Sequence, residues 1–111
     1  MMYGKKLSAK KTVITCQAYY AIQKYFKGKE GKLDLARIVN SVVHKLIRNH
    51  LDGDWGDLCD EDKELNDIDV KEGGRILSKF NIEESEFYVI TEAVNEGGVR
   101  PLTKVLLTCE Y

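Results

Sequence analysis

The chain has 111 residues, 43% of them hydrophobic, which is enough for one domain with one core. This length excludes two-lobed kinases, Rossmann-type methyltransferases and αβ barrels. The formal net charge of −1 hides an uneven distribution, because residues 1–50 carry 11 Lys and Arg and 2 acids, whereas residues 51–111 carry 6 Lys and Arg and 16 acids. Such an asymmetry is typical of a nucleic-acid-binding surface or of an electrostatic contact within the molecule.

Neither the N-terminus nor the cysteines indicate export. No apolar h-region follows the basic residues 1–6, and no run of about 18 apolar residues could span a membrane. Cys16, Cys59 and Cys109 lie far apart with no C-x-x-C pair, which favours reduced thiols over disulfides or a zinc site. We therefore expect a cytoplasmic protein, in the host cytoplasm if a phage encodes it, with no metal and no cofactor.

The N-terminal residues 1–11 are rich in lysine and predict a flexible basic arm that precedes a single domain of residues 12–111. The lysines of this arm are Lys5, Lys6, Lys10 and Lys11. A short β-prone stretch follows at residues 12–14, and Thr15 is placed to cap a helix. The apolar side of this helix comprises Ala18, Tyr19, Ile22, Tyr25 and Phe26. The charged glycine loop at residues 27–32 ends the helix and lacks the spacing of a phosphate-binding loop.

The strongest predicted element is a second helix that begins after Asp34, a good N-cap residue. Its apolar stripe comprises Leu35, Ile38, Val39, Val42, Val43, Leu46 and Ile47. The same spacing places His50 at the core-facing end of the helix, whereas His44 points outward. Glycines break the helix in the connection at residues 51–58, which contains the single tryptophan, Trp55.

A third helix begins among the acids that follow residue 59, where negative charge suits the helix dipole, and ends at Gly73. Its thin apolar face, formed by Leu58, Leu65 and Ile68, predicts a helix on the surface. From Ile76 onward the hydrophobic period changes to two, which predicts three strands joined by short polar turns.

The predicted fold class is therefore α+β, with two to three N-terminal helices packed on a C-terminal three-stranded antiparallel meander. Because a sheet of three strands exposes an edge, we also expect a homodimer.

The centre of the chain reads His50-x-x-Gly-Asp-Trp-Gly-Asp-Leu58 and is followed by Val89-Ile-Thr-Glu-Ala93 and a terminal Leu-Leu-x-x-Glu-Tyr111. Together these motifs resemble a family of small bacterial, plasmid and phage proteins that often carry labels such as "plasmid-related protein" or "type I restriction subunit M". The resemblance covers about residues 46–111. Val94 stands where the family usually has Asp, and Thr108-Cys109 where it has Pro-Glu.

The resemblance implies the company of mobile elements, whose small proteins commonly act on host defence systems. Together with the acidic residues 52–72 and the lack of a convincing catalytic set, it leads us to expect a non-enzymatic accessory protein that modulates or inhibits a host defence system. Its partner would be a host defence protein, in the manner of an anti-restriction or anti-CRISPR protein, or a small signalling nucleotide that it sequesters. The restriction label does not imply a methyltransferase, because the chain is too short and has no N-P-P-[FY] tetrad.

The central motif supplies the candidate binding residues, and each has two interpretations. The candidates are His50, Asp54, Trp55, Asp57, Asp62, Asn66 and Glu92. A metal-dependent hydrolase or nuclease acting on nucleotides would use His50, Asp54 and Asp57. In the structural interpretation, His50 lies at the negative end of the helix dipole and bonds a loop carboxylate, while the aspartates cap turns and the next helix. Trp55 is either part of the core or a stacking platform for a base. The spacing of the aspartates does not fit an EF-hand.

The charged halves leave two further alternatives. The lysines of residues 1–32, interleaved with aromatics, could bind phosphates as in a nucleic-acid-binding accessory factor, or could form a solvated face. The acids of residues 52–72 could mimic nucleic acid towards a basic partner, or could simply be solvated. Nucleophilic catalysis has little support, since there is no G-x-S-x-G motif and Cys59 lies among acids. We expect the functional surface at residues 50–72.

Overall fold

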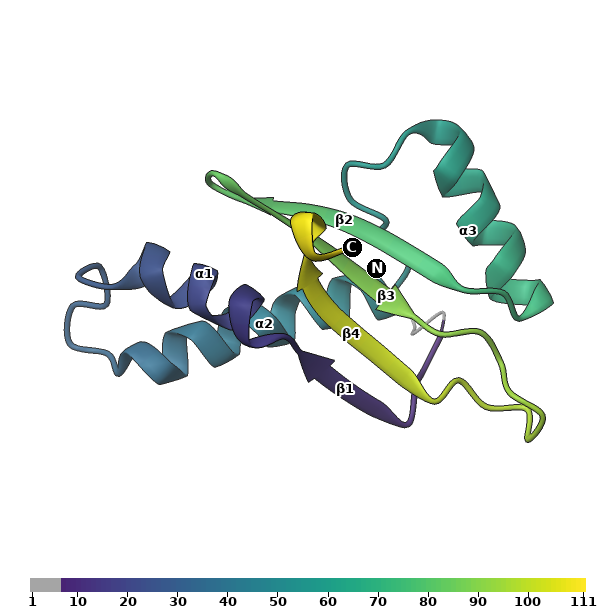
Figure 1. Ribbon diagram of the computed structural model, residues 1–111, viewed down its shortest axis with the longest axis horizontal. Coiled ribbons are helices and arrows are strands. Elements are labelled where there is room, and N and C mark those ends of the chain that lie inside the picture. Colours follow the sequence, from purple (N-terminus) through teal and green to yellow (C-terminus); the bar gives the residue numbers. More distant parts are fainter. Residues whose placement is uncertain (1–6) are drawn as a thin grey trace, which may run out of the picture.

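The computed structural model describes residues 7–111 and contains one mixed four-stranded sheet (Figure 1). Its strands are β1 (Lys11–Ile14), β2 (Ile76–Ile82), β3 (Ser85–Thr91) and β4 (Leu102–Leu107), in the order β1-β4-β3-β2. The pairs β2–β3 and β3–β4 are antiparallel, whereas β1 runs parallel to β4. A short 3₁₀ helix, η1 (Thr108–Glu110), follows β4.

Helices α1 (Cys16–Phe26) and α2 (Leu35–Leu51) cover one face of this sheet. Both begin where the sequence predicts, because the Thr15 hydroxyl accepts the Ala18 N–H at 3.1 Å and the Asp34 carboxylate accepts the Ala36 N–H at 3.0 Å. The main core is formed between the helices and alternate residues of β3 and β4. Its fully buried members are Ala18, Ile22, Val39, Phe87, Val89 and Val105.

Helix α3 (Asp60–Glu72) lies apart from this pair, beside the outer edge of β2 (Figure 1). It ends as predicted at Gly73, whose φ of 88° is in the left-handed region that glycine adopts without strain. A second, smaller core connects α3 and the end of α2 to β2. It contains Leu7, Leu51, Trp55 and Ile76, with Ile47, Leu58 and Val70 packed against them.

The α+β class is confirmed, but the predicted arrangement is only partly right. The three C-terminal strands do form an antiparallel meander, yet the sheet has a fourth strand, β1, which precedes all the helices. The sequence shows that residues 12–14 favour an extended backbone, but the parallel pairing of β1 with β4 depends on contacts across about ninety residues. Local propensity carries no information about such a pairing.

Residues 1–6 of the predicted basic arm, including Lys5 and Lys6, lie outside the described residues. Residues 7–11, the remainder of the predicted flexible arm, pack and hydrogen-bond against the rest of the domain, so the expectation of a flexible arm is wrong for them. Leu7 is buried and its N–H donates to the Leu51 carbonyl at 3.2 Å, while the Lys10 N–H donates to the Arg100 carbonyl at 3.0 Å. Within residues 7–111, no helix is both long enough and apolar enough to cross a bilayer.

Candidate functional site

The residues of the central motif meet where the end of α2, the edge of β2 and the start of α3 come together. His50 ends α2 on its core side, as the sequence predicts, and its side chain is fully buried. Its Nδ1 lies 2.6 Å from Ser78 Oγ on β2, and its Nε2 lies 2.8 Å from Thr91 Oγ1 on β3. Both ring nitrogens therefore have partners inside the protein, and neither faces solvent.

The hydrogen bonds around His50 fix its tautomer. The Ser78 hydroxyl donates its single proton to the Asp54 carbonyl at 2.9 Å, so its oxygen accepts from the imidazole and Nδ1 must carry the hydrogen. Nε2 is then the acceptor for the Thr91 hydroxyl, which in turn accepts from the Thr103 hydroxyl at 2.7 Å. The result is one directional chain of hydrogen bonds through the inner face of three strands.

This environment keeps His50 neutral. Burial, and to a smaller extent the positive charge of Arg100, lower the pKa of its imidazole to about 4. A neutral imidazole with both nitrogens bonded inside the core cannot abstract a substrate proton or bind a metal without opening the fold. The partners of His50 are therefore two hydroxyl groups of the sheet, and not the loop carboxylate that the structural interpretation of the sequence expects. His44, by contrast, is exposed as predicted.

Trp55 is also part of the core, with an exposed fraction of only 5%. Its indole Nε1 donates to the Asp67 carboxylate of α3 at 3.0 Å, and its ring packs edge-on against His50 with centroids 5.9 Å apart. Its backbone extends the sheet, because the Lys79 N–H donates to the Trp55 carbonyl at 3.2 Å and the Lys79 carbonyl accepts the Asp57 N–H at 2.8 Å. Trp55 offers no open face to a base.

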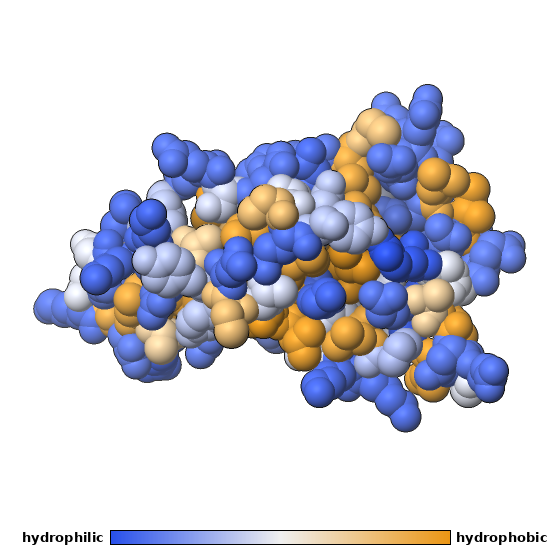
Figure 2. Space-filling model, viewed as in Figure 1, coloured by the Kyte–Doolittle hydropathy of each residue, from blue (hydrophilic) through white to orange (hydrophobic). Residues whose placement is uncertain are grey.

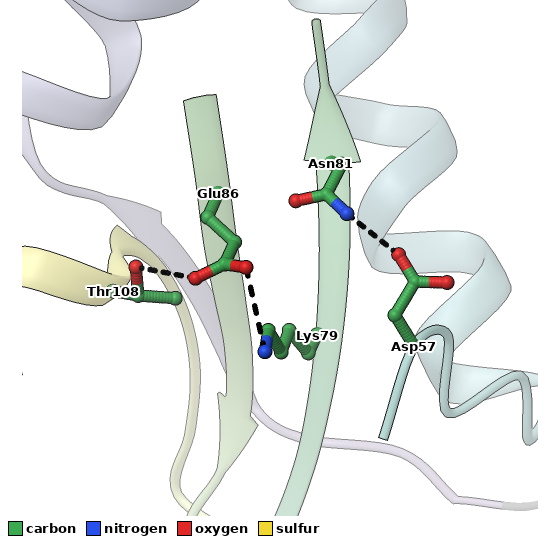
Figure 3. Close-up of polar contacts among 5 residues, drawn as sticks. All are labelled: Asp57, Lys79, Asn81, Glu86 and Thr108. Atoms are coloured by element: carbon green, nitrogen blue, oxygen red, sulfur yellow. Dashed lines mark hydrogen bonds and ion pairs between the residues drawn. The ribbon is translucent and has the colours of Figure 1, made fainter. Parts of the chain in front are cut away.

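The two aspartates of the motif shape this turn. Asp54 accepts the Gly56 N–H at 2.9 Å, and Asp57 accepts from the Asn81 amide of β2 at 2.8 Å (Figure 3). Gly56 is required here, since its φ is 69° and an added Cβ would lie 1.9 Å from the Lys79 carbonyl oxygen. The carboxylates therefore point to different partners and do not converge on His50.

Side-chain hydrogen bonds attach helix α3 to the sheet, and the Asn66 amide bonds the edge of β2 in the way that the backbone of a neighbouring strand would. The Asn66 amide donates to the Leu77 carbonyl at 2.6 Å and accepts the Leu77 N–H at 3.2 Å, so it satisfies the edge of β2. At the other end of α3, the buried Arg100 guanidinium donates to the carbonyls of Asp69 at 2.9 Å and Gly74 at 2.6 Å. One of the two edges of the sheet, that of β2, is thus covered at Leu77 by the chain itself.

The remaining candidate residues lie outside this cluster. Glu92, just beyond β3, is partly buried, and its backbone carbonyl accepts from Arg100 at 3.1 Å. Asp62 is exposed in the first turn of α3. Lys10 directly precedes β1 and Lys11 is its first residue, and both are exposed. The structure therefore brings His50, Trp55, Asp57 and Asn66 to one junction, and leaves Asp62 and the lysines on the surface.

The accessible part of this region is the outer side of α3. Leu65 and Ile68 are 56% and 54% exposed, so two of the three residues of the predicted apolar face point to solvent, whereas Leu58, just before the helix, packs against the smaller core. The helix carries 7 acids and 2 lysines. None of these charges forms an ion pair within residues 7–111, where the one ion pair joins Lys79 of β2 to Glu86 of β3 (Figure 3). Figure 2 shows hydrophobic residues set among strongly hydrophilic ones over α3.

A groove between α1 and the β2–β3 turn is a second accessible feature, and sequence reasoning did not find it as a site. The only signal for it in the sequence is the interleaving of Tyr20 and Tyr25 with lysines, which the sequence indicates as a feature of phosphate binding and not of a groove. Across residues 7–111, no three His, Cys, Asp or Glu side chains lie close enough together to hold a metal ion. Comparison with protein-family models, with curated proteins and with solved structures finds no match to this chain.

Proposed function

We propose that this protein is a non-enzymatic binding protein, and that the outer face of α3 docks into a cationic groove on a partner protein. The observation that carries the proposal is the pair of exposed apolar side chains, Leu65 and Ile68, on a helix with 7 acids. Large apolar side chains that share an exposed patch are typical of an interaction site rather than of a solvated helix.

The spacing along α3 places these residues on a single stripe. Glu61, Leu65, Ile68 and Glu72 follow one another at intervals of four, three and four residues, so carboxylates flank the apolar pair at both ends. Helices that dock into grooves use apolar anchors at this spacing. The opposite side of α3 carries Asn66 and Val70, which face the sheet.

The fold holds α3 in place for such a contact. The Trp55 indole donates a hydrogen bond to Asp67 in the helix, and Asn66 bonds the helix to β2. Arg100 donates to a backbone carbonyl near the C-terminal end of the helix. A helix held in advance loses little conformational freedom on binding, which favours affinity. The central motif therefore has an indirect role in this proposal, because it positions the helix that makes the contact.

The chemistry of α3 suggests the class of partner. Carboxylates along a helix can occupy sites where Lys and Arg of another protein bind phosphates. The resemblance to proteins of plasmids and phages suggests a host defence protein that handles nucleic acid, and blocking its cationic groove would inhibit it stoichiometrically. A metal-dependent hydrolase built on His50, Asp54 and Asp57 finds no support in the geometry, because the three side chains bind different partners.

The test is a panel of purified restriction and CRISPR effector proteins, with binding measured by biolayer interferometry and with duplex DNA as competitor. We expect at least one effector to bind in competition with DNA. Serine at both Leu65 and Ile68 should weaken that binding by roughly tenfold or more, since central apolar anchors dominate such interfaces. Leu33→Ser is the matched control, because Leu33 is 62% exposed in a different part of the chain.

The same variants should be followed in cells by plating or plasmid-transfer efficiency against the corresponding defence systems. Protection that is lost with the α3 double variant and retained with Leu33→Ser supports the proposal. If no effector binds, or if the double variant binds and protects as well as the wild type, the proposal is wrong.

A further inference from the structure

A groove with a volume of about 740 Å³ lies between α1 and the turn that joins β2 to β3. Figure 1 shows the tip of this hairpin beside α1. The volume is within the range of sites for small ligands. The groove shares no residue with the outer face of α3, so whatever it binds is independent of the function proposed above.

One wall of the groove is aromatic. Tyr20 lies on α1 and is 62% exposed, so its ring is available for stacking. Tyr25, one turn further along, is held in place from both sides. Its hydroxyl donates to the Glu83 carboxylate at 2.9 Å, and the Lys29 ammonium lies 4.6 Å from the centre of its ring. The hydrogen bond to Glu83 raises the pKa of Tyr25, so the hydroxyl stays protonated and remains a donor.

The charges of the groove are separated between its two sides. Lys24 and Lys29 line the helical side, and α1 itself contains no acid. Glu83 and Glu84 form the turn between the paired residues Ile82 and Ser85 on the other side. The groove therefore presents ammonium groups at one side, carboxylates at the other, and tyrosine rings with them.

The two glutamates of the turn differ in availability. Glu83 has a φ of 52°, a left-handed conformation that non-glycine residues rarely adopt, and its carboxylate is engaged by Tyr25. Among the described residues, Glu84 has neither a hydrogen-bond partner nor an ion-pair partner, and it is exposed in the groove. A carboxylate only accepts hydrogen bonds, so its complement is a group with adjacent donors.

We propose that this groove binds a guanine nucleotide. The base would stack on Tyr20, its N1–H and exocyclic amino group would donate to the Glu84 carboxylate, and the phosphates would lie against Lys24. Each contact uses a feature that the groove already presents: a free aromatic face, an unpaired acceptor and a positive side. Adenine fits less well, because its corresponding edge places an acceptor nitrogen against the carboxylate.

Calorimetric titration of the full chain with GTP, ATP, guanosine and inorganic triphosphate tests this assignment. We expect GTP to bind roughly tenfold or more tightly than ATP, because an acceptor facing Glu84 is left unsatisfied in the ATP complex. Inorganic triphosphate should bind more weakly than GTP, since it lacks the stacking contact. Equal affinities of GTP and ATP, equal affinities of GTP and triphosphate, or no binding at millimolar nucleotide would each overturn the proposal.

Single substitutions separate the three contacts. Glu84→Gln should abolish the preference for GTP over ATP, whereas Glu96→Gln, in an exposed loop, should leave it unchanged. Tyr20→Ala should weaken both nucleotides, and Tyr111→Ala is its control at a matched exposure of 63%. Lys24→Ala should weaken GTP but not guanosine. These residues are all on the surface, and thermal melts will verify that each variant is folded. Retention of the GTP preference by Glu84→Gln would contradict the assignment.

Discussion

Lowering the pH from about 7.5 to about 5 should destabilise the protein through one side chain, His50. The imidazole is buried and neutral, and its pKa is lowered to about 4 from an ordinary value of 6.5. Unfolding exposes the ring, which then takes up a proton readily. The stabilisation from keeping it neutral is therefore fully present above about pH 6.5 and is lost as the pH falls towards about 4.

The size of this effect follows from the two pKa values. A difference of about 2.5 units corresponds to about 3 kcal/mol over the whole range, of which about 2 kcal/mol is lost by pH 5. Urea denaturation at a series of pH values measures the free energy of unfolding directly.

Two variants test whether His50 causes this loss of stability. His50→Gln removes the titration, so its unfolding free energy should change little across this window, although it will start lower by about 1–3 kcal/mol because the hydrogen bonds are imperfectly replaced. His44→Gln, at an exposed position, should keep the wild-type slope. As a check that needs no variant, the His50 ring resonances in NMR spectra should not titrate between about pH 7.5 and 5. A His50→Gln slope equal to that of the wild type would refute a neutral, buried His50.

Substitutions at the covered edge of β2 test its role in stability. Asn66→Ala should lower the free energy of unfolding by about 2–4 kcal/mol, because both backbone groups of Leu77 lose their partner, and light scattering should show increased self-association through the opened edge. Gly56→Ala should cost about 3 kcal/mol in thermal or urea unfolding, since the new Cβ would meet the Lys79 carbonyl. Gly28→Ala, at a φ of 84° with open space around it, should cost only about 1 kcal/mol. Equal effects of the two glycine substitutions would contradict the close contact.

The central motif shows how a sequence signature can mark a structural junction. His, Asp and Trp at short spacing suggest a reactive site, and the sequence left that interpretation open beside the structural one. In the fold, Trp55 and Asp57 instead continue the sheet beyond β2, and Asp54 closes the turn around Gly56. Such contacts restrict the residue type at a position as strictly as a catalytic role does, because each contact depends on one donor, one acceptor or one backbone conformation.

The sequence by itself determined the local elements. Thr15, Asp34 and Gly73 mark helix ends through hydrogen bonds and backbone conformations that involve only near neighbours. The periods of 3.6 and 2 likewise separate helices from strands, and they place His50 on the core side of α2. These features depend on residues within one or two turns of each other.

The tertiary structure alone decided what those elements contact. The orientation of α3 is the clearest case, because two anchoring hydrogen bonds, from Asn66 and from Trp55 to Asp67, turn Leu65 and Ile68 towards solvent against the expectation from hydrophobicity. The parallel pairing of β1 and the groove beside Tyr20 similarly join segments that are distant in the sequence. Hydrophobic patterns report which side of a helix is apolar, whereas long-range hydrogen bonds decide which side is buried.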